Sequence, residues 1–318
     1  MPFTPMPMEG PATEADIRLV IIQMIYGIPS YFLMISFFIF LGCSKRFDNS
    51  FYRLVQLDLI TNILCYFNNW IALRIGVFSL GVAIRKSMET LVPGCLTWCA
   101  YAMRWFFNMQ FCSAAALSIH RITVVLFPHR SEVLWCRYYP VYGIVSAIYS
   151  ALTELVYPGK TDNIEIFNGT LTNFADMERA AKAGWLIAIL SAVYFVLLSG
   201  IGLTTAYLVT QHLKGPAHQG IKKKLTRVAL TNTVLYLGVT LWSINSAMNS
   251  IYKFFPGFYA ISNLVLTFAS DMITLCLPYI LLTFDSNIRK EIGIRLHLVR
   301  ATPKVTPFAV SLTTSPNS

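Results

Sequence analysis

Three ionisable residues lie deep inside long apolar stretches of this sequence and are its first candidates for chemistry. They are Asp58, Arg104 and Asp271. Charged groups in an apolar medium are costly, so they usually face the interior of a helix bundle or a watery cavity. We expect Asp58 to couple helices through water or an ion, or else to be protonated and merely hydrogen-bonded. Arg74 and Glu154 fall nearer the ends of their stretches, where their side chains can reach the headgroup region.

Arg104 and Asp271 are predicted to lie at similar depth. Arg104 precedes Arg121 by 17 residues and Asp271 precedes Asp285 by 14 residues, which in a helix corresponds to ~25 Å and ~21 Å above the same end. If their helices are neighbours, the two side chains form an ion pair. Such a pair either lines a ligand cavity or serves only to hold the helices together.

Aromatic and amide side chains surround this level of the sequence and complete a candidate ligand pocket. A mostly apolar pocket with a few orienting polar groups is typical of small-molecule sites. Ordinary helix packing, with hydrogen bonds from Asn between helices, explains the same residues equally well. The candidates, besides Arg104 and Asp271, are Tyr101, Trp105, Asn108, Trp242 and Asn245.

Seven long apolar runs carry these residues. The chain is 55% hydrophobic and 13% charged, with a mean hydropathy of +0.57, and each run approaches the ~20 residues that a helix needs to cross a bilayer. The sequence therefore predicts an all-α membrane protein with a seven-transmembrane helix bundle. The predicted helices cover roughly 18–41, 53–74, 95–119, 138–157, 183–209, 228–252 and 258–283.

The distribution of charge predicts the orientation of this bundle. Most of the 25 Lys and Arg residues follow the first, third, fifth and seventh runs, and cytoplasmic loops are the ones that retain such residues. The N-terminus is therefore expected outside and the C-terminus in the cytoplasm. The net charge of +10 is explained by anchoring at the lipid bilayer, so no nucleic-acid partner is expected.

A glycosylation sequon gives the same orientation. Asn168-Gly169-Thr170 lies in the loop after the fourth run, which the charge distribution places outside, where Asn168 can be glycosylated.

The remaining segments are short tails. Residues 1–17 are predicted to be a disordered extracellular tail, 18–283 the transmembrane domain, and 284–318 a cytoplasmic tail with a short amphipathic helix followed by disorder. Pro278, like Pro29, is expected to kink its helix, as a structural feature or as a hinge.

No catalytic motif and no metal-ligand spacing occurs in the sequence. We therefore expect no enzyme activity, no catalytic residue, no metal and no cofactor. The odd number of runs and the missing internal repeat argue against a duplicated transporter. A ligand-gated channel or small-molecule transporter, with the intramembrane charges along its path, remains the alternative to a receptor.

Several local motifs together resemble nematode chemoreceptors of serpentine receptor class gamma, over most of residues 18–295. The motifs are Leu117-Ser118-Ile119-His120-Arg121-Ile122 continuing through Phe127-Pro128 to Trp135; Phe51-Tyr52-Arg53-Leu54 with Asp58, Asn62 and Asn69; and Leu277-Pro278-Tyr279 followed by Asn287-Ile288-Arg289.

The resemblance implies a seven-helix receptor in the plasma membrane of sensory neurons. It would bind a small-molecule cue and signal to a heterotrimeric G protein. By similarity, Arg121 stands where rhodopsin-type receptors keep the arginine that contacts the G protein, but His120 replaces the acid that usually precedes it. The expected G-protein face is Arg121, Arg130, Lys222, Lys223 and Lys224, although the three lysines also suit a basic anchor at the membrane.

Overall fold

The protein is seen here in a computed structural model that describes residues 4–8, 12–156, 162–212, 234, 236–238, 240–245, 248 and 258–295. The chain divides into two compact units, Met1–Tyr279 and Ile280–Ser318.

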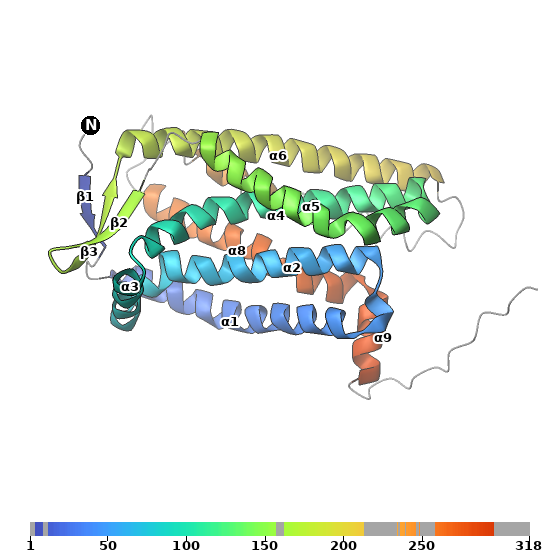
Figure 1. Ribbon diagram of the computed structural model, residues 1–318, viewed down its shortest axis with the longest axis horizontal. Helices are drawn as coiled ribbons and strands as arrows, with labels where there is room; N and C mark the ends of the chain where they lie inside the picture. The colour runs from blue at the N-terminus through green and yellow to red at the C-terminus, as the bar shows by residue number, and fades with distance from the viewer. Residues whose placement is uncertain are drawn as a thin grey trace, which may run out of the picture. The chain divides into compact units, whose positions relative to one another are not determined.

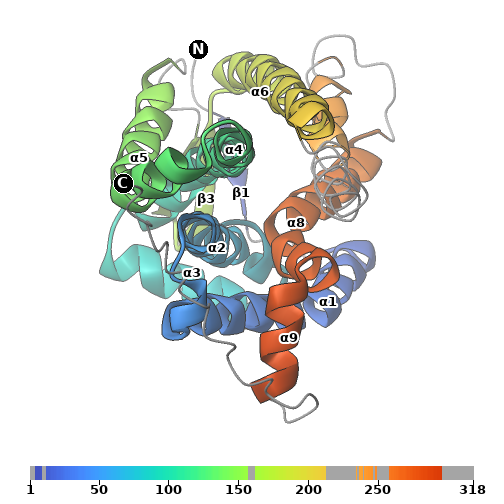
Figure 2. The ribbon, with the colours of Figure 1, turned by 90° about the vertical axis from the view of Figure 1, so that its right-hand side faces the viewer.

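Long helices form most of the first unit, and they lie side by side (Figure 1). Seen end on, α4 packs against α2, α5 and α6 (Figure 2), while α1 packs against α2. Short helical segments follow α1 and α2. The long helices are α1 (Glu14–Cys43), α2 (Ser50–Asn69), α4 (Cys95–Leu126), α5 (Pro128–Val156), α6 (Met177–His212) and α8 (Phe258–Phe284), and the short ones are η1 (Lys45–Phe47), η2 (Trp70–Arg74), η3 (Ile75–Val77) and α3 (Ser79–Leu91).

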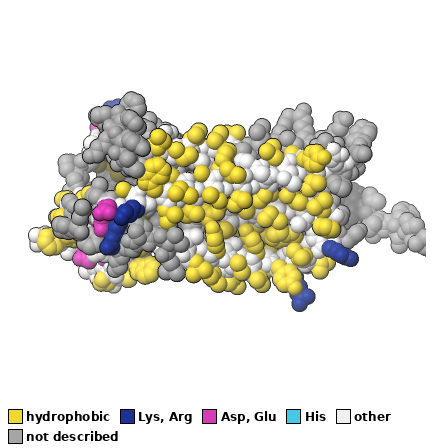
Figure 3. Space-filling model, turned by 90° about the horizontal axis from the view of Figure 1, so that it is seen from above, with side chains coloured by type: hydrophobic (Ala, Val, Ile, Leu, Met, Phe, Trp, Pro, Cys, Tyr) yellow, Lys and Arg dark blue, Asp and Glu magenta, His cyan; other side chains and the backbone are white. Residues whose placement is uncertain are grey.

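Six of the seven predicted apolar runs coincide with described helices. The sixth run, 228–252, lies mostly outside the described residues, although 234, 236–238, 240–245 and 248 are helical. Within the described residues, Glu14–Cys43 and Glu178–Leu208 are long and apolar enough to cross a membrane, and Phe268–Phe284 with Ser286–Arg295 adds a third if the bent pair is one span. The face in Figure 3 is covered mainly by hydrophobic side chains. The count of seven spans stays a prediction.

The helices extend beyond the apolar runs at the junction of α4 and α5. The runs predicted helices over 95–119 and 138–157, but α4 continues to Leu126 and α5 begins at Pro128. Only Phe127 separates them. Hydropathy identifies the part of a helix that suits lipid, not its full length, and proline is favoured at a first helical position because it lacks the N–H that would go unpaired there.

Part of the N-terminal tail is ordered, which corrects the expectation of disorder over 1–17. Strand β1 (Thr4–Pro7) pairs antiparallel with β3 (Thr170–Ala175), which also pairs with β2 (Asp162–Phe167) in the order β1-β3-β2. Proline cannot donate to a sheet ladder and is tolerated at an edge, so the proline-rich tail can still add a strand. Thr13 and Asp16 then form a capping box that starts α1.

The loop after the fourth run is a hairpin that covers the beginning of α4. Its turn consists of Asn168 (φ 50°) and Gly169 (φ 77°), the positive φ values that a tight Asn-Gly hairpin requires. The backbone N–H of Ile164 donates to Thr97 Oγ1 at 2.8 Å, and Ile164 and Leu171 pack on Leu96. The hairpin is thereby attached to the first turn of α4.

In the second unit, a short helix follows α8: α9 covers Ser286–Arg295. Its amphipathic character stays a prediction. Asp285 begins it, because its carboxylate accepts the backbone N–H of Asn287 at 2.8 Å. The disorder predicted for the rest of the tail concerns residues 296–318, outside the described part of the chain.

Candidate ligand site

A π-helical turn at the end of α2 positions the central residue of the site. Residues Trp70–Arg74 form η2, directly after Asn69. A π turn adds one residue to the helical repeat, which rotates the following side chains by about 100° relative to a continuous α-helix. Arg74 is then only 4% exposed. This corrects the expectation that its side chain would extend to the headgroup region.

Arg74 forms a buried ion pair with Asp271 of α8. Arg74 Nη2 donates to Asp271 Oδ1, and the two side chains are 4% and 1% exposed. Tyr26 of α1 donates from its hydroxyl to the other carboxylate oxygen of Asp271. The guanidinium also lies over the rings of Tyr66 and Trp70, at 5.3 and 5.4 Å from their centroids. This cluster connects α1, η2 and α8.

Arg74 borders a cavity of about 190 Å³ inside the first unit. Helices α2, α4, α6 and α8 contribute to its wall, as do two helical residues, Trp242 and Ser243. Most of the surface is apolar, with polar groups from the two arginines and a few amides and hydroxyls. The wall consists of Cys65, Asn69, Leu73, Arg74, Met103, Arg104, Phe107, Gln110, Ile187, Trp242, Ser243, Ser270 and Ile273.

The predicted ion pair between Arg104 and Asp271 is wrong. Arg104 pairs with Glu154 of α5, with Nη2 at 3.1 Å from Oε2, while Asp271 pairs with Arg74. Arg74, the partner of Asp271, and Arg104 border the same cavity. The error lay in the partners. Glu154 and Arg74 were assigned to the headgroup region, but each faces a neighbouring helix and neutralises the charge that was expected to pair elsewhere.

The other predicted pocket residues fall into two groups. Trp242 borders the cavity. The described wall of the cavity does not include the other four candidates, Tyr101, Trp105, Asn108 and Asn245. The Tyr101 ring lies under the Arg104 guanidinium, 4.8 Å from its centroid. Trp105 Nε1 donates to Ala147 O at 3.0 Å, and Asn108 Nδ2 donates to Thr153 Oγ1 at 2.7 Å. Asn245 is exposed. For Tyr101, Trp105 and Asn108, the geometry supports helix packing.

A second polar layer connects α2, α4 and α8. Asp58 is buried and accepts hydrogen bonds from Ser113 Oγ and, at 3.1 Å, from Asn62 Nδ2. Gln110 Nε2 donates to Asn62 Oδ1 at 2.7 Å and to Thr274 Oγ1 at 3.0 Å. Gln110 also borders the cavity. Asp58 thus joins α2 to α4 through side chains, and Gln110 extends the layer to α8.

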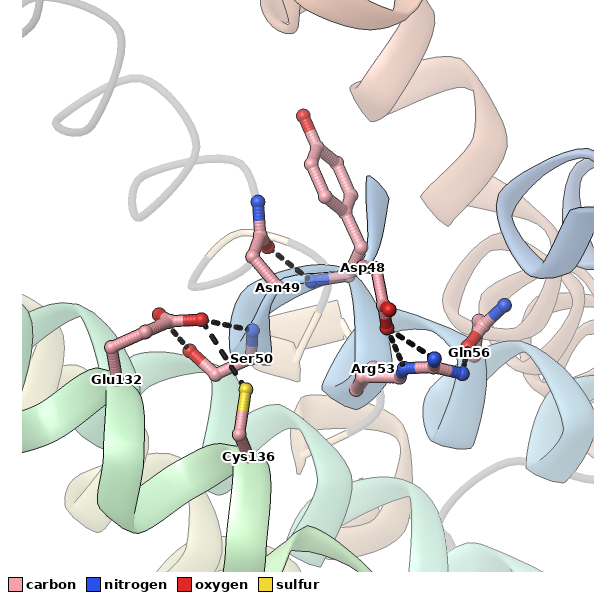
Figure 4. A network of polar contacts seen from close by, with 8 residues as sticks. Asp48, Asn49, Ser50, Arg53, Gln56, Glu132 and Cys136 are labelled. Atoms are coloured by element: carbon pink, nitrogen blue, oxygen red, sulfur yellow. Dashed lines mark hydrogen bonds and ion pairs between the residues drawn. The ribbon is translucent and has the colours of Figure 1, made fainter. Parts of the chain in front are cut away.

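A polar network joins the beginnings of α2 and α5 to α4. Figure 4 shows the part between α2 and α5. The Glu132 carboxylate accepts the backbone N–H of Ser50 at 2.8 Å and its hydroxyl at 2.6 Å. The same hydroxyl lies 2.7 Å from His120 Nε2. Beside it, Asp48 accepts from Arg53 Nε at 3.0 Å. We call Ser50, His120 and Glu132 the Ser50 network.

The predicted G-protein face is only partly described. Arg121, next to His120 in α4, is half-buried and Arg130 in α5 is exposed. Lys222, Lys223 and Lys224 lie outside the described residues. Pro278 lies inside α8, one residue before Tyr279, whose hydroxyl is 2.7 Å from Ser30 Oγ of α1.

Sequence reasoning missed Arg74, Gln110 and Glu154 as members of the site. Arg74 had one available signal: Trp70 and Arg74 stand four residues apart after a polar Asn68-Asn69 pair, at the end of an otherwise apolar run. Nothing in the sequence indicated the π turn that makes Arg74 face inwards.

Comparison with known proteins gives a consistent result over nearly the whole chain. Residues 20–292 match the model of the Srg family, described as Srg family chemoreceptor. The chain is 35% identical to serpentine receptor class gamma-47 of Caenorhabditis elegans over 288 residues, which cover 89% of this chain and 93% of that protein. It is 26% identical to serpentine receptor class gamma-53 of the same organism, over 88% of this chain and 92% of that one.

Proposed function

Since the chain belongs to the Srg family of chemoreceptors, we propose that it binds a small molecule in the cavity beside Arg74 and signals to a heterotrimeric G protein. The family and the apolar helices make it a membrane protein, and the family is not one of enzymes. The observation that carries the proposal is the cavity itself: a mostly apolar chamber inside the bundle, with buried charged groups in its wall.

The proposed orientation places the N-terminus and the hairpin outside and the C-terminus in the cytoplasm of a sensory neuron, at its plasma membrane. The charge distribution of the loops supports it. So does the sequon, because Asn168 lies exposed in the turn of the hairpin.

Glycosylation tests this orientation directly. Thr170→Ala removes the sequon and leaves Asn168 and the turn in place, so we expect a receptor expressed in animal cells to lose its glycosidase-sensitive form on a gel. Thr170→Ser keeps the sequon and should keep that form. If glycosidase does not change the mobility of the wild-type chain on the gel, glycosylation at Asn168 is contradicted.

The proposed mechanism is a shift between two arrangements of the helices. A ligand that binds one arrangement better moves the population towards it. The cavity is bordered by α2, α4, α6 and α8, and the Ser50 network connects α2, α4 and α5 at the opposite end of α2. A change in helix packing at the cavity thereby reaches the end of α4 that carries Arg121.

The proposed G-protein contact is the face formed by Arg121, Arg130 and Lys222–Lys224. Arg121→Ala is expected to abolish the signal evoked by a ligand and to leave ligand binding unchanged, because Arg121 lies outside the cavity wall. Cells that express the receptor are exposed to a panel of small odorants and pheromone-like molecules, and cyclic nucleotide and calcium are recorded. Binding is measured on the same variant.

The rival function gives a different result in the same cells. A ligand-evoked current that persists without any G protein supports a ligand-gated channel and contradicts the receptor mechanism. If Arg121→Ala lowers binding and signalling in parallel, the assignment of Arg121 to the G-protein face is wrong.

A further inference from the structure

Arg74 has hydrogen-bond donors without an acceptor, and the residue borders the cavity. Its Nη2 donates to Asp271, but Nε and Nη1 are buried and have no acceptor among the described residues. The residue borders the cavity and is only 4% exposed. A buried donor on a charged group that lacks an acceptor costs more free energy than an ordinary hydrogen bond contributes. An acceptor atom in the cavity therefore removes that cost.

The charges around the cavity indicate that this acceptor is uncharged. Arg74 is neutralised by Asp271 and Arg104 by Glu154. The described residues of the wall include no other Lys, Arg, Asp or Glu. An anion in the cavity would lose its hydration and lie near two carboxylates without an uncompensated cation to attract it. A carbonyl, ether or hydroxyl oxygen avoids this cost and still accepts from Arg74.

The volume of the cavity, which is partly open, indicates how large a ligand body it can enclose. A cavity of about 190 Å³ is somewhat larger than the ~150 Å³ engineered cavity known to hold benzene. Most of the remaining wall is apolar, with Leu73, Phe107 and Ile273 among its members. The body of the ligand is therefore compact and apolar, about the size of a single substituted ring.

From these three observations, the geometry points to a specific ligand class: a compact, uncharged molecule with an apolar body and an oxygen that accepts a hydrogen bond from Arg74. This inference rests on the proposed function, because it assigns the ligand of the same cavity. Asp271 and Tyr26 act as positioning residues, since their contacts hold the guanidinium at the wall.

Three fluorinated probes of matched shape test the ligand class. They are 4-fluoroacetophenone, which has a carbonyl; 4-fluoro-α-methylstyrene, which has a methylene group in its place; and 4-fluorobenzoate, which is an anion. Binding to the full chain in lipid nanodiscs is followed by fluorine NMR, with empty nanodiscs as the control for partition into lipid. We expect the ketone to bind about tenfold or more tightly than the alkene, and the benzoate to bind most weakly.

Two paired variants locate the effect. Arg74→Met with Asp271→Asn removes the guanidinium, keeps the wall neutral and leaves an acceptor for Tyr26, so the preference for the ketone should disappear. Lys182→Met with Glu178→Gln removes an exposed ion pair of α6 that lies outside the cavity wall, and it should retain the preference. If the Arg74 variant does not fold, the ranking of the three probes on the unchanged chain still tests the ligand class.

Each contrary result overturns a defined part of the inference. Equal binding of ketone and alkene contradicts an acceptor at Arg74 and indicates that water pairs with it. Tighter binding of benzoate contradicts the uncharged class, and no binding of any probe contradicts the cavity as a site of this size. The assay needs no G protein. If the receptor prefers the ketone but none of these compounds evokes a signal, the binding site is supported and only the proposed signalling role is contradicted.

Discussion

Replacing Arg74 alone with methionine is expected to lower the free energy of unfolding by about 3–5 kcal/mol. The reason is the isolation of its partner. Asp271 is 1% exposed in its side chain, and without Arg74 its carboxylate keeps only the Tyr26 hydroxyl as a described partner. A carboxylate left in such surroundings must either stay charged at high cost or take up a proton. Thermal unfolding of the purified receptor, together with its surface expression, measures the loss.

The paired variant distinguishes stability that comes from the Arg74–Asp271 ion pair from stability that comes from Arg74 alone. Arg74→Met with Asp271→Asn leaves no unpaired charge, so most of the lost stability should return, because neutral replacement of both partners of a buried pair is often close to neutral. Arg18→Ala is the matched control. It breaks the ion pair between Arg18 and Glu14, whose side chains are 73% and 80% exposed, so it should change the free energy of unfolding little. A double variant as unstable as Arg74→Met contradicts the coupling.

Hydropathy and spacing predicted the long helices because apolar runs long enough to span a bilayer leave the backbone few other ways to satisfy its hydrogen bonds. They also predicted that Arg104 and Asp271 would lie at comparable depth inside the bundle. They did not predict which helices meet. The pairing of Arg104 with Glu154, and of Asp271 with Arg74, depends on the rotation of each helix about its axis.

The π turn shows why the rotation of this helix could not be predicted from the sequence. One additional residue in the turn at Trp70–Arg74 moves Arg74 from the expected outer surface to the interior, and no residue type in that segment requires such a turn. The strand at Thr4–Pro7 was missed for a related reason. Its pairing with β3 is a contact between segments more than 150 residues apart, which local composition does not encode.

Glu132→Leu is expected to raise signalling in the absence of ligand. Burial acts to raise the pKa of Glu132, but the hydrogen bonds from the hydroxyl and backbone N–H of Ser50 outweigh it and lower the pKa below its usual 4.5. The carboxylate is therefore charged at neutral pH and loses its contribution only as the pH falls through that lowered pKa. Its two hydrogen bonds from Ser50, at 2.8 and 2.6 Å, hold the beginnings of α2 and α5 together.

If the cytoplasmic ends of these helices separate when the receptor activates, the Ser50 network stabilises the resting state alone. Hydrogen bonds to a charged group contribute about 1.5–3 kcal/mol each, so losing them shifts the balance towards the active state by about tenfold or more. Basal cyclic nucleotide and calcium signals, corrected for surface expression, measure that shift. Glu132→Gln keeps an acceptor for Ser50 and should give an intermediate rise.

A neighbouring pair supplies the control for this last experiment (Figure 4). Asp48 and Arg53 form an ion pair beside the Ser50 network. Arg53 lies in α2, and Asp48 lies two residues before Ser50, the first residue of that helix. Their pair joins no second long helix, so Asp48→Asn should leave basal signalling unchanged. A rise with Asp48→Asn equal to that with Glu132→Leu indicates a general loosening of this region. A rise with Glu132→Leu alone locates the resting contact between α2 and α5, beside His120 and Arg121 of α4.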